Sequence, residues 1–227
     1  MEHKIIKIFE QKVKPLKQYN FLVAVSGGVD SMVLANLFIQ NNLNFSIAHC
    51  NFGLRAEESN ADQEFILSWS RKNKIKYFSS KFSTTAFCEK SNVSIQEGAR
   101  NLRYNWFNEL KVIHKFDYIV TAHHLDDCVE TYIWSSLHGT SKVIPLTRNN
   151  VIRPFLTTRK QDFIYWCESH NVPWIEDESN KNSRYTRNYI RNELMPHALH
   201  INPGLPKLVK KIVENKKKKL NHQKFVS

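Results

Sequence analysis

Six consecutive residues, Ser26-Gly27-Gly28-Val29-Asp30-Ser31, have the composition of an anion-binding turn. The apolar run Phe21–Val25 before them predicts a buried strand, and Met32–Ile39 after them predicts a helix. The two glycines allow the chain to turn with positive φ and allow a ligand to approach the backbone closely. The helix directs its free N–H groups and its positive dipole end at the same place. We therefore expect a phosphate group to bind here.

The turn differs from the common nucleotide-binding motifs. No lysine follows the glycines, so it is not the GxxxxGK[ST] loop, and the GxGxxG spacing is also absent. An ordinary strand-to-helix turn capped by a Ser or Asp side chain is the alternative interpretation. Asp30 would be repelled by a bare phosphate, so we expect it to cap the helix, to bind a metal or to contact a polar substrate group.

A second group of polar residues runs from His123 to Glu130. It contains His123, His124, Asp126, Asp127 and Glu130, and it follows the apolar segment Asp117–Ala122. Glu130 lies one helical turn after the two aspartates, so their carboxylates can share a face. Such carboxylates could hold Mg²⁺ or accept the ammonium group of an amine. The HExxH and HxxEH spacings of zinc enzymes are absent, and a helix N-cap with incidental histidines is the alternative.

Two further clusters carry polar side chains. His49-Cys50-Asn51-Phe52-Gly53-Leu54-Arg55 follows the predicted strand Asn44–His49, and Glu97–Tyr104 lies within a predicted helix. Arg100 and Arg103 are three residues apart and therefore share a face of that helix. Two guanidinium groups on one face suit a phosphate or the charge that develops in phosphoryl transfer, whereas a solvated helix face is the alternative.

Strands and helices alternate along the first 140 residues. Besides those already named, the patterns predict strands at Ile75–Phe82 and Val151–Phe155 and helices at 3–18, 56–72, 91–112, 126–137, 157–170 and 185–194. This alternation predicts an α/β fold with a doubly wound parallel sheet. Ligands bind such sheets at the carboxyl ends of the strands, where the polar clusters fall. We expect a catalytic domain over residues 1–200 and a basic helical tail over 201–227.

Composition restricts the class of protein. The formal net charge of +12 favours a polyanionic partner, although a genome-wide lysine bias would give the same excess. Four widely spaced cysteines form no CxxC pair, so we expect buried free thiols rather than a redox or metal motif. No apolar run could span a bilayer and the N-terminus lacks a signal-peptide pattern, so we expect a cytoplasmic protein without a membrane partner.

Taken together and in order, the clusters resemble the tRNA(Ile)-lysidine synthetase family of PP-loop ATP pyrophosphatases, whose fold is of the adenine nucleotide alpha hydrolase type. The resemblance covers roughly residues 20–203. It is carried by these segments: Ser26–Ser31, His49–Arg55, Glu97–Arg100 with Arg103, Tyr104 and Phe107, His123–Asp127 with Glu130 and Thr131, Arg153–Leu156, Glu176–Asn180 and Arg187–Arg191.

The resemblance implies a ligase that modifies tRNA. ATP adenylates the C2 oxygen of the wobble cytidine in a CAU-anticodon tRNA(Ile), and free L-lysine then attacks C2 through its ε-amine. Lysidine forms and AMP and pyrophosphate are released, which changes codon reading from AUG to AUA and tRNA identity from Met to Ile. Because the amine must lose a proton to attack, nearby carboxylates can bind lysine and move that proton.

The resemblance also assigns site residues. Asp127 and Glu130 would hold the lysine, Asp30 would serve ATP or Mg²⁺, and Arg103 would act near the phosphate. The catalytic residues expected are Asp30, Arg103, Asp127 and Glu130. The ATP-binding residues expected are Ser26, Gly27, Gly28, Val29, Asp30 and Ser31. The substrate-binding residues expected are His49, Asn51, Arg55, Arg100, His123, Asp126, Asp127 and Glu130. The cofactors expected are ATP, as a substrate, and Mg²⁺ at Asp30.

Two features depart from the family pattern. Leu137–Lys142 replaces its Arg-Gly-x-Gly stretch, which removes any contact made by that arginine. Many members continue into further tRNA-binding domains, whereas this chain ends at Ser227, so we expect a smaller RNA-binding surface aided by the basic segment Lys207–Lys219. The oligomeric state is open, with a homodimer as one option. Another PP-loop enzyme, such as a tRNA thiolase, and a non-catalytic RNA-binding module are the alternative functions.

Overall fold

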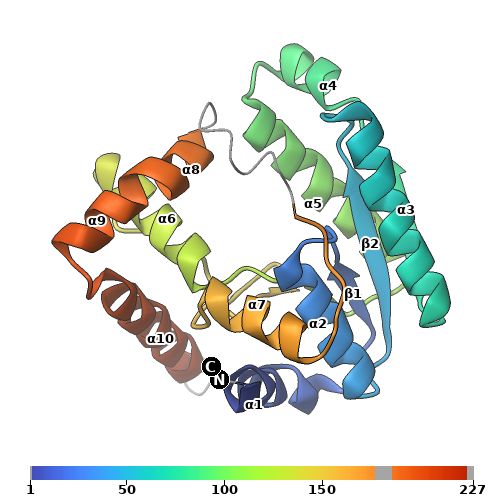
Figure 1. The fold of residues 1–227 in the computed structure, drawn as a ribbon, viewed down its shortest axis with the longest axis horizontal. Helices are drawn as coiled ribbons and strands as arrows, with labels where there is room; N and C mark the ends of the chain where they lie inside the picture. Colours follow the sequence, from blue (N-terminus) through green and yellow to red (C-terminus); the bar gives the residue numbers. More distant parts are fainter. Residues whose placement is uncertain (1, 177–185, 224–227) are drawn as a thin grey trace.

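The computed structural model describes residues 2–176 and 186–223, and in that part of the chain one mixed sheet forms the centre of the molecule (Figure 1). Its strands lie in the order β3-β2-β1-β4-β6-β5. The strands are β1 (Phe21–Ala24), β2 (Phe45–Asn51), β3 (Lys76–Lys81), β4 (Tyr118–Val120), β5 (Thr147–Arg148) and β6 (Val151–Ile152). All neighbouring pairs are parallel except β5 and β6, which are antiparallel. The predicted α/β class with a doubly wound parallel sheet is confirmed.

Helices follow most of the strands and cover the sheet. They are α1 (Glu2–Lys12), α2 (Val29–Gln40), α3 (Ala56–Lys72), α4 (Thr84–Ser91), α5 (Ile95–Ile113), α6 (Leu125–Leu137), α7 (Lys160–Ser169), α8 (Thr186–Tyr189), α9 (Met195–Ile201) and α10 (Leu205–Gln223). A short 3₁₀ turn, η1 (Lys14–Leu16), follows α1, and a π-helical turn, η3 (Ile190–Leu194), joins α8 to α9. No helix of the described ranges has the length and apolar character that crossing a bilayer requires.

The central strand β1 is buried on both faces, as its uninterrupted apolar sequence predicts. Phe21 and Val23 belong to the cluster formed with α1, α2, α3 and α7. Leu22 points to the opposite side and packs in the cluster that includes Phe107 and Leu110 of α5. Helices on both faces therefore fix the position of β1, and the turn after it is held at the carboxyl edge of the sheet.

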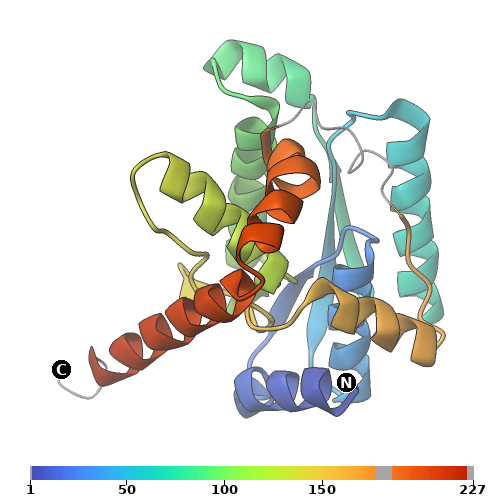
Figure 2. The same ribbon diagram turned by 60° about the vertical axis from the view of Figure 1, so that its left-hand side comes forward.

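A third apolar cluster attaches the C-terminal helix to the domain. Leu205, Val209 and Val213 of α10 pack with Leu125 and Val129 of α6, outside the sheet (Figure 2). These three residues form the side of α10 that faces α6. The division of the chain at residue 200 stays a prediction.

The predicted helix at 91–112 was wrong at its start. Asn92 adopts φ +50 and ends α4, a helix that the sequence pattern had not indicated. Ser94 then caps α5, because its side chain accepts a hydrogen bond from the Glu97 N–H. Asn tolerates the left-handed conformation and Ser is a favoured N-cap, so these two residues explain the break. The strand predicted at Val151–Phe155 is also shorter, because pairing ends at Ile152.

Gly98 of α5 leaves no room for a side chain beside α4, and replacing it should destabilise the fold. A Cβ atom at position 98 would clash with the Sγ atom of Cys88. We expect Gly98→Ala to lower the free energy of unfolding by about 1–3 kcal/mol, the usual cost of overpacking. Urea denaturation would measure the loss. Adding Cys88→Ala should restore most of it by removing the clashing sulfur, and a double variant as unstable as Gly98→Ala would contradict this explanation.

Candidate active site at the carboxyl edge of the sheet

The turn between β1 and α2 is closed by its own side chains. The Ser31 Oγ donates to the Gly28 carbonyl at 2.9 Å and accepts from the Ser26 N–H at 3.2 Å. Gly27 has φ +93, which only glycine adopts without strain, and its carbonyl accepts from the Ile175 N–H at 2.9 Å. Gly28 has φ −68, so the expectation of positive φ holds for Gly27 and was wrong for Gly28. The first turn of α2 begins at Val29, as an anion-binding turn requires.

His124 links this turn to the acidic cluster. Its Nε2 atom lies 3.6 Å from Asp30 Oδ2 and 3.7 Å from Asp127 Oδ2, and its Nδ1 atom lies 3.6 Å from Asp126 Oδ2. Burial of the ring lowers the pKa of His124, but the surrounding carboxylates, Asp127 first, more than offset that effect and raise it. A protonated His124 would therefore place a positive charge between the phosphate-binding turn and the carboxylates of α6.

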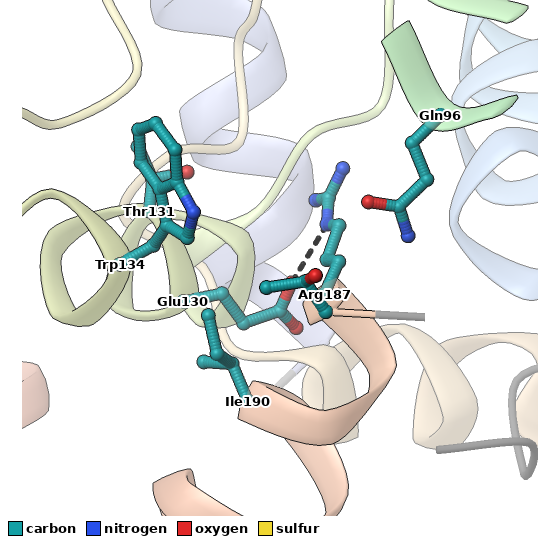
Figure 3. Close-up of a pocket in the computed structure, with 7 residues that line it drawn as sticks. Gln96, Glu130, Thr131, Trp134, Arg187 and Ile190 are labelled. Carbon is teal, nitrogen blue, oxygen red and sulfur yellow. Dashed lines mark hydrogen bonds and ion pairs between the residues drawn. The ribbon is translucent and has the colours of Figure 1, made fainter. Parts of the chain in front are cut away.

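Two arginines without a predicted role form ion pairs with the carboxylates of α6. Arg187 donates to Asp127 Oδ1 and to Glu130 Oε2, both at 2.9 Å, and the second contact is drawn in Figure 3. Arg191 donates to Glu130 Oε1 at 2.5 Å and to Asp127 Oδ1 at 3.2 Å. Glu130 is only 2% exposed. Two guanidinium groups thus neutralise two buried carboxylates, which a buried charge requires.

The Asp127 carboxylate stays ionised in this arrangement. Burial by itself would raise its pKa, but His124, Arg187 and His123 hold the pKa well below its usual range. The same carboxylate accepts the His124 N–H at 2.9 Å and so caps α6. Asp127 is therefore a negatively charged group held in place at both oxygens. Oδ2 accepts from the backbone N–H of His124, and Oδ1 accepts from the two arginines.

Asp126 points to a different neighbour. Its Oδ1 atom accepts from the Arg159 guanidinium at 2.9 and 3.0 Å, and its Oδ2 atom accepts from the Lys160 N–H at 2.8 Å. Asp126 thus joins α6 to the start of α7. The structure does not place it with the Asp127–Glu130 pair, and a substrate contact by Asp126 stays a prediction.

The predicted cluster His49–Arg55 begins inside β2, and its polar side chains contact the residue after β1 and residues of α3. The His49 Nδ1 lies 3.0 Å from the Val25 carbonyl, and the Asn51 amide donates to Ser59, Asn60 and Gln63. Arg55 pairs with Glu58 and Asp62 at 3.3 and 2.7 Å. These contacts give His49, Asn51 and Arg55 a part in shaping the loop, and their roles in substrate binding stay predictions.

Two arginines of α5 lie over aromatic rings in cation–π contacts. The Arg103 guanidinium lies 5.1 Å from the centre of the Phe52 ring, and that of Arg100 lies 4.8 Å from the Tyr104 ring. The Tyr104 hydroxyl accepts a hydrogen bond from Arg153 at 3.4 Å. The expected pairing of Arg100 and Arg103 on one face agrees with these positions, and their action on a phosphate stays a prediction.

Sequence comparisons identify the family. A sequence model described as the PP-loop domain matches residues 1–198. The chain belongs to the PP-loop family. It is similar to the tRNA(Ile)-lysidine synthases of Bacteroides thetaiotaomicron, with 34% identity over 90% of this chain, and of Bacillus subtilis, with 31% over 88%. This PP-loop chain spans about half the length of the curated relatives it matches, 49% and 44% in these two cases.

Solved structures show the same fold. One is a U34-tRNA thiolase, NcsA from Methanococcus maripaludis with its [4Fe-4S] cluster, which has a TM-score of 0.77 at 13% identity over 94% of this chain and 78% of that chain. Another is an NH₃-dependent NAD synthetase from Campylobacter jejuni, with a TM-score of 0.57 at 16% identity over 94% and 92% of the two chains. At these identities the likeness concerns the PP-loop fold alone.

One atom near the PP-loop suits a divalent cation. Asp30 Oδ1 is buried and has no hydrogen-bond partner in the described part of the chain. Mg²⁺ commonly takes one or two protein carboxylates and completes its shell with water and substrate phosphates. Asp30 fits that pattern as a single ligand. Over residues 2–176 and 186–223, no three His, Cys, Asp or Glu side chains gather as a metal site of their own.

Acid should weaken this PP-loop domain partly through His123. Burial, together with nearby arginines, lowers the pKa of His123 from 6.5 to about 3, although Asp127 acts in the opposite direction. The native ring is then neutral, while the unfolded chain binds a proton near pH 6.5. The contribution of His123 to stability is therefore complete above pH 6.5 and is lost as the pH falls below 6.5. His124, whose pKa is raised, has the opposite effect: its contribution to stability is lost as the pH rises above 6.5. We expect His123→Asn to reduce the loss of stability between about pH 6.5 and 5.

Urea denaturation of both proteins at several pH values would measure this effect. The His123→Asn variant should show a smaller fall in the transition midpoint over that interval than the original chain. An identical fall in both proteins would show that His123 does not titrate differently in the native and unfolded states.

Proposed function

We propose that this chain catalyses the ATP-dependent joining of lysine to C2 of the wobble cytidine in a CAU-anticodon tRNA(Ile). The observation that carries the proposal is the short distance between the PP-loop and the acidic pair. His124 lies within 3.7 Å of both Asp30 and Asp127, and Arg187 bonds to both Asp127 and Glu130. A phosphate-binding turn and a buried acidic pair meet in one site. The named relatives, at 30–34% identity over most of this chain, support the same reaction.

The first step would occur at the PP-loop. The cytidine O2 attacks the α-phosphorus of ATP, the bond to the bridging oxygen breaks, and pyrophosphate leaves with the electron pair. The N–H groups at the start of α2 would bind phosphate oxygens, and Arg103 would lie where it can offset developing charge. Bound Mg²⁺, with Asp30 as its protein ligand, would neutralise phosphate charge.

The second step would occur at the carboxylates. The ε-amine of lysine attacks C2, the C2–O bond breaks and AMP leaves, while the amine loses its protons. Asp127 and Glu130 would bind the incoming ammonium group, and a carboxylate released from a guanidinium contact would receive the proton. Because Arg187 and Arg191 already occupy these carboxylates, lysine binding would exchange at least one guanidinium contact for an ammonium contact.

The structure gives little support to a thiolase. The four cysteines are free, and burial raises the pKa values of Cys50, Cys128 and Cys167 to about 12. Protonated thiols are poor nucleophiles and poor metal ligands. The lysine ligase therefore agrees better with the side chains present.

The cytoplasmic location, the homodimer and the RNA-binding role of the basic tail are further parts of the proposal. Lys207 and Lys211 are exposed on α10, while its apolar residues face α6. This arrangement leaves basic side chains available for a polyanion.

A labelled-substrate assay tests the proposed reaction. The chain is incubated with ATP, radiolabelled lysine and one RNA at a time: CAU-anticodon tRNA(Ile), tRNA(Met) with the same anticodon, or no RNA. We expect pyrophosphate, AMP and RNA-bound lysine in equal amounts with tRNA(Ile) only. RNA-dependent sulfur transfer from cysteine would indicate a thiolase, and tRNA binding without pyrophosphate release would indicate a binding module.

A further inference from the structure

A pocket of about 180 Å³ has Glu130 and Arg187 in its wall and extends from them to Trp134 and Gln96 (Figure 3). Its walls come from the beginning of α5, the middle of α6 and the α8–η3 segment. The lining residues are Gln96, Glu130, Thr131, Trp134, Thr186, Arg187 and Ile190. In Figure 3, Trp134 and Gln96 project from different helices toward the same space, with the Arg187 guanidinium between them.

Trp134 is an unusual tryptophan for this chain. All five tryptophans lie in the described ranges, and Trp134, at 45%, is the one whose exposed fraction exceeds about a third. Large aromatic side chains are normally well buried, and the exposed indole of Trp134 at the pocket wall is available to a ligand.

A histidine holds this indole from outside the pocket. The rings of His138 and Trp134 stack with centroids 4.5 Å apart and planes inclined by 30°. The His138 ring is fixed in turn, because its Nδ1 lies 2.8 Å from the Trp134 carbonyl. His138 belongs to the segment that departs from the family pattern. Stacking on one face limits the rotamers of Trp134 and leaves the indole pre-oriented for a second planar group.

While Arg187 and Arg191 remain bound to Glu130, the charges of the pocket favour a neutral guest over a cation. Each Glu130 oxygen already accepts a hydrogen bond, from Arg187 or from Arg191, so the carboxylate offers little net charge to the pocket. Other polar groups of the lining include the Gln96 amide, the Thr186 hydroxyl and the Thr131 hydroxyl, which donates to the Asp127 carbonyl and can still accept. Amide and hydroxyl groups can both donate and accept, which suits the edge of a nucleobase.

We propose that this pocket binds a nucleobase of the substrate RNA, stacked on Trp134 and contacted at its edge by Gln96. The inference rests on the proposed function for the identity of the RNA. Base stacking on an aromatic side chain is the common device by which proteins hold unpaired bases, and the excess positive charge of the chain suits an RNA partner. Trp134 is a binding residue in this proposal, and His138 is a positioning residue.

Fluorescence and binding titrations test the subsite with an anticodon stem-loop RNA bearing CAU, at one fixed salt concentration. RNA should quench the fluorescence of the original chain, and Trp134→Phe should remove most of that change while keeping much of the affinity. Trp134→Leu should weaken RNA binding by roughly 5- to 100-fold, the usual loss when the aromatic side chain that stacks on one base is removed. The dissociation constant for ATP and the KM for lysine should not change.

Two controls accompany these variants. Leu137→Ala removes an exposed apolar residue from the same helix, outside the pocket, and should leave RNA binding unchanged. His138→Leu should weaken RNA binding by less than Trp134→Leu does, because the indole of Trp134 remains and only its rotamers are less restricted. Thermal unfolding of each variant shows whether it is folded.

The outcomes separate this proposal from the proposed function. Trp134→Leu binding RNA as tightly as the original chain would overturn the subsite, as would a variant that changed only the KM for lysine. Absence of RNA binding by the original chain would overturn it too. If RNA binding falls in Trp134→Leu while the original chain transfers no lysine, the subsite stands and the proposed reaction fails.

Discussion

Replacing Asp127 with asparagine should reduce lysine transfer to tRNA by about 100-fold or more, while pyrophosphate release from ATP persists. Asparagine can still accept the His124 N–H and so keeps the cap of α6, but it cannot receive a proton or bind an ammonium group as an anion. Adenylated RNA should therefore accumulate. Separate assays of pyrophosphate release and of RNA-bound radiolabelled lysine would show this division.

The controls for Asp127 address charge and folding. Asp127→Ala should abolish lysine transfer too, and it should also destabilise the fold because it removes the cap and leaves Arg187 and Arg191 with one carboxylate. Asp117→Asn changes an aspartate that accepts the Asn20 N–H before β1, away from the site, and should leave both assays unchanged. Lysine transfer at the original rate by Asp127→Asn would remove Asp127 from the mechanism.

Replacing Asp30 with asparagine should stop the reaction one step earlier. The carboxylate lies in the first turn of α2, and its buried Oδ1 is the group that fits a cation bound to the phosphates of ATP. Loss of that charge should lower pyrophosphate release by about 100-fold or more, which is typical when one electrostatic contact to a transition state is removed. Lysine transfer should fall by the same factor, because it depends on the adenylated RNA.

Comparison of the two variants gives the sharpest test of the proposed site. Asp30→Asn should affect both assays equally, whereas Asp127→Asn should affect only lysine transfer. Raising the Mg²⁺ concentration should recover part of the activity of Asp30→Asn and none of that of Asp127→Asn, since only the first would bind the cation. Equal effects of both variants on pyrophosphate release would contradict the assignment of separate steps.

Much of the fold could be predicted from local patterns. The helix at Ala56–Lys72 has the predicted bounds, and the buried strand β1 and the turn after it lie where the apolar runs placed them. Hydrophobic periodicity predicts such elements because one side of each must be buried. The position of the polar clusters at the carboxyl edge then follows from the parallel connections.

The contacts of the site could not be predicted in the same way. Arg187 and Arg191 are separated from Asp127 by about sixty residues, and no local rule pairs them. Their spacing of four residues, opposite carboxylates spaced by three, was the one signal that could have suggested the pairing. The hydrogen bonds that Asn51 and Asp126 make depend likewise on which helices pack beside them. The segment 177–185, which contains part of the family-like stretch Glu176–Asn180, lies outside the described residues.

The packing of α10 on α6 has an evolutionary consequence. Leu125, Cys128 and Val129, which contact the cluster formed with α10, alternate in sequence with Asp126, Asp127 and Glu130 on the same two turns. A change in the volume of one apolar residue on α10 would therefore shift the helix that carries the carboxylates. Substitutions at Leu205, Val209 and Val213 should covary with those at Leu125 and Val129 among relatives, although none of these five side chains takes part in the chemistry. Natural selection that preserves the reaction would therefore also act on α10, which lies beyond residues 1–198, the part that matches the PP-loop domain.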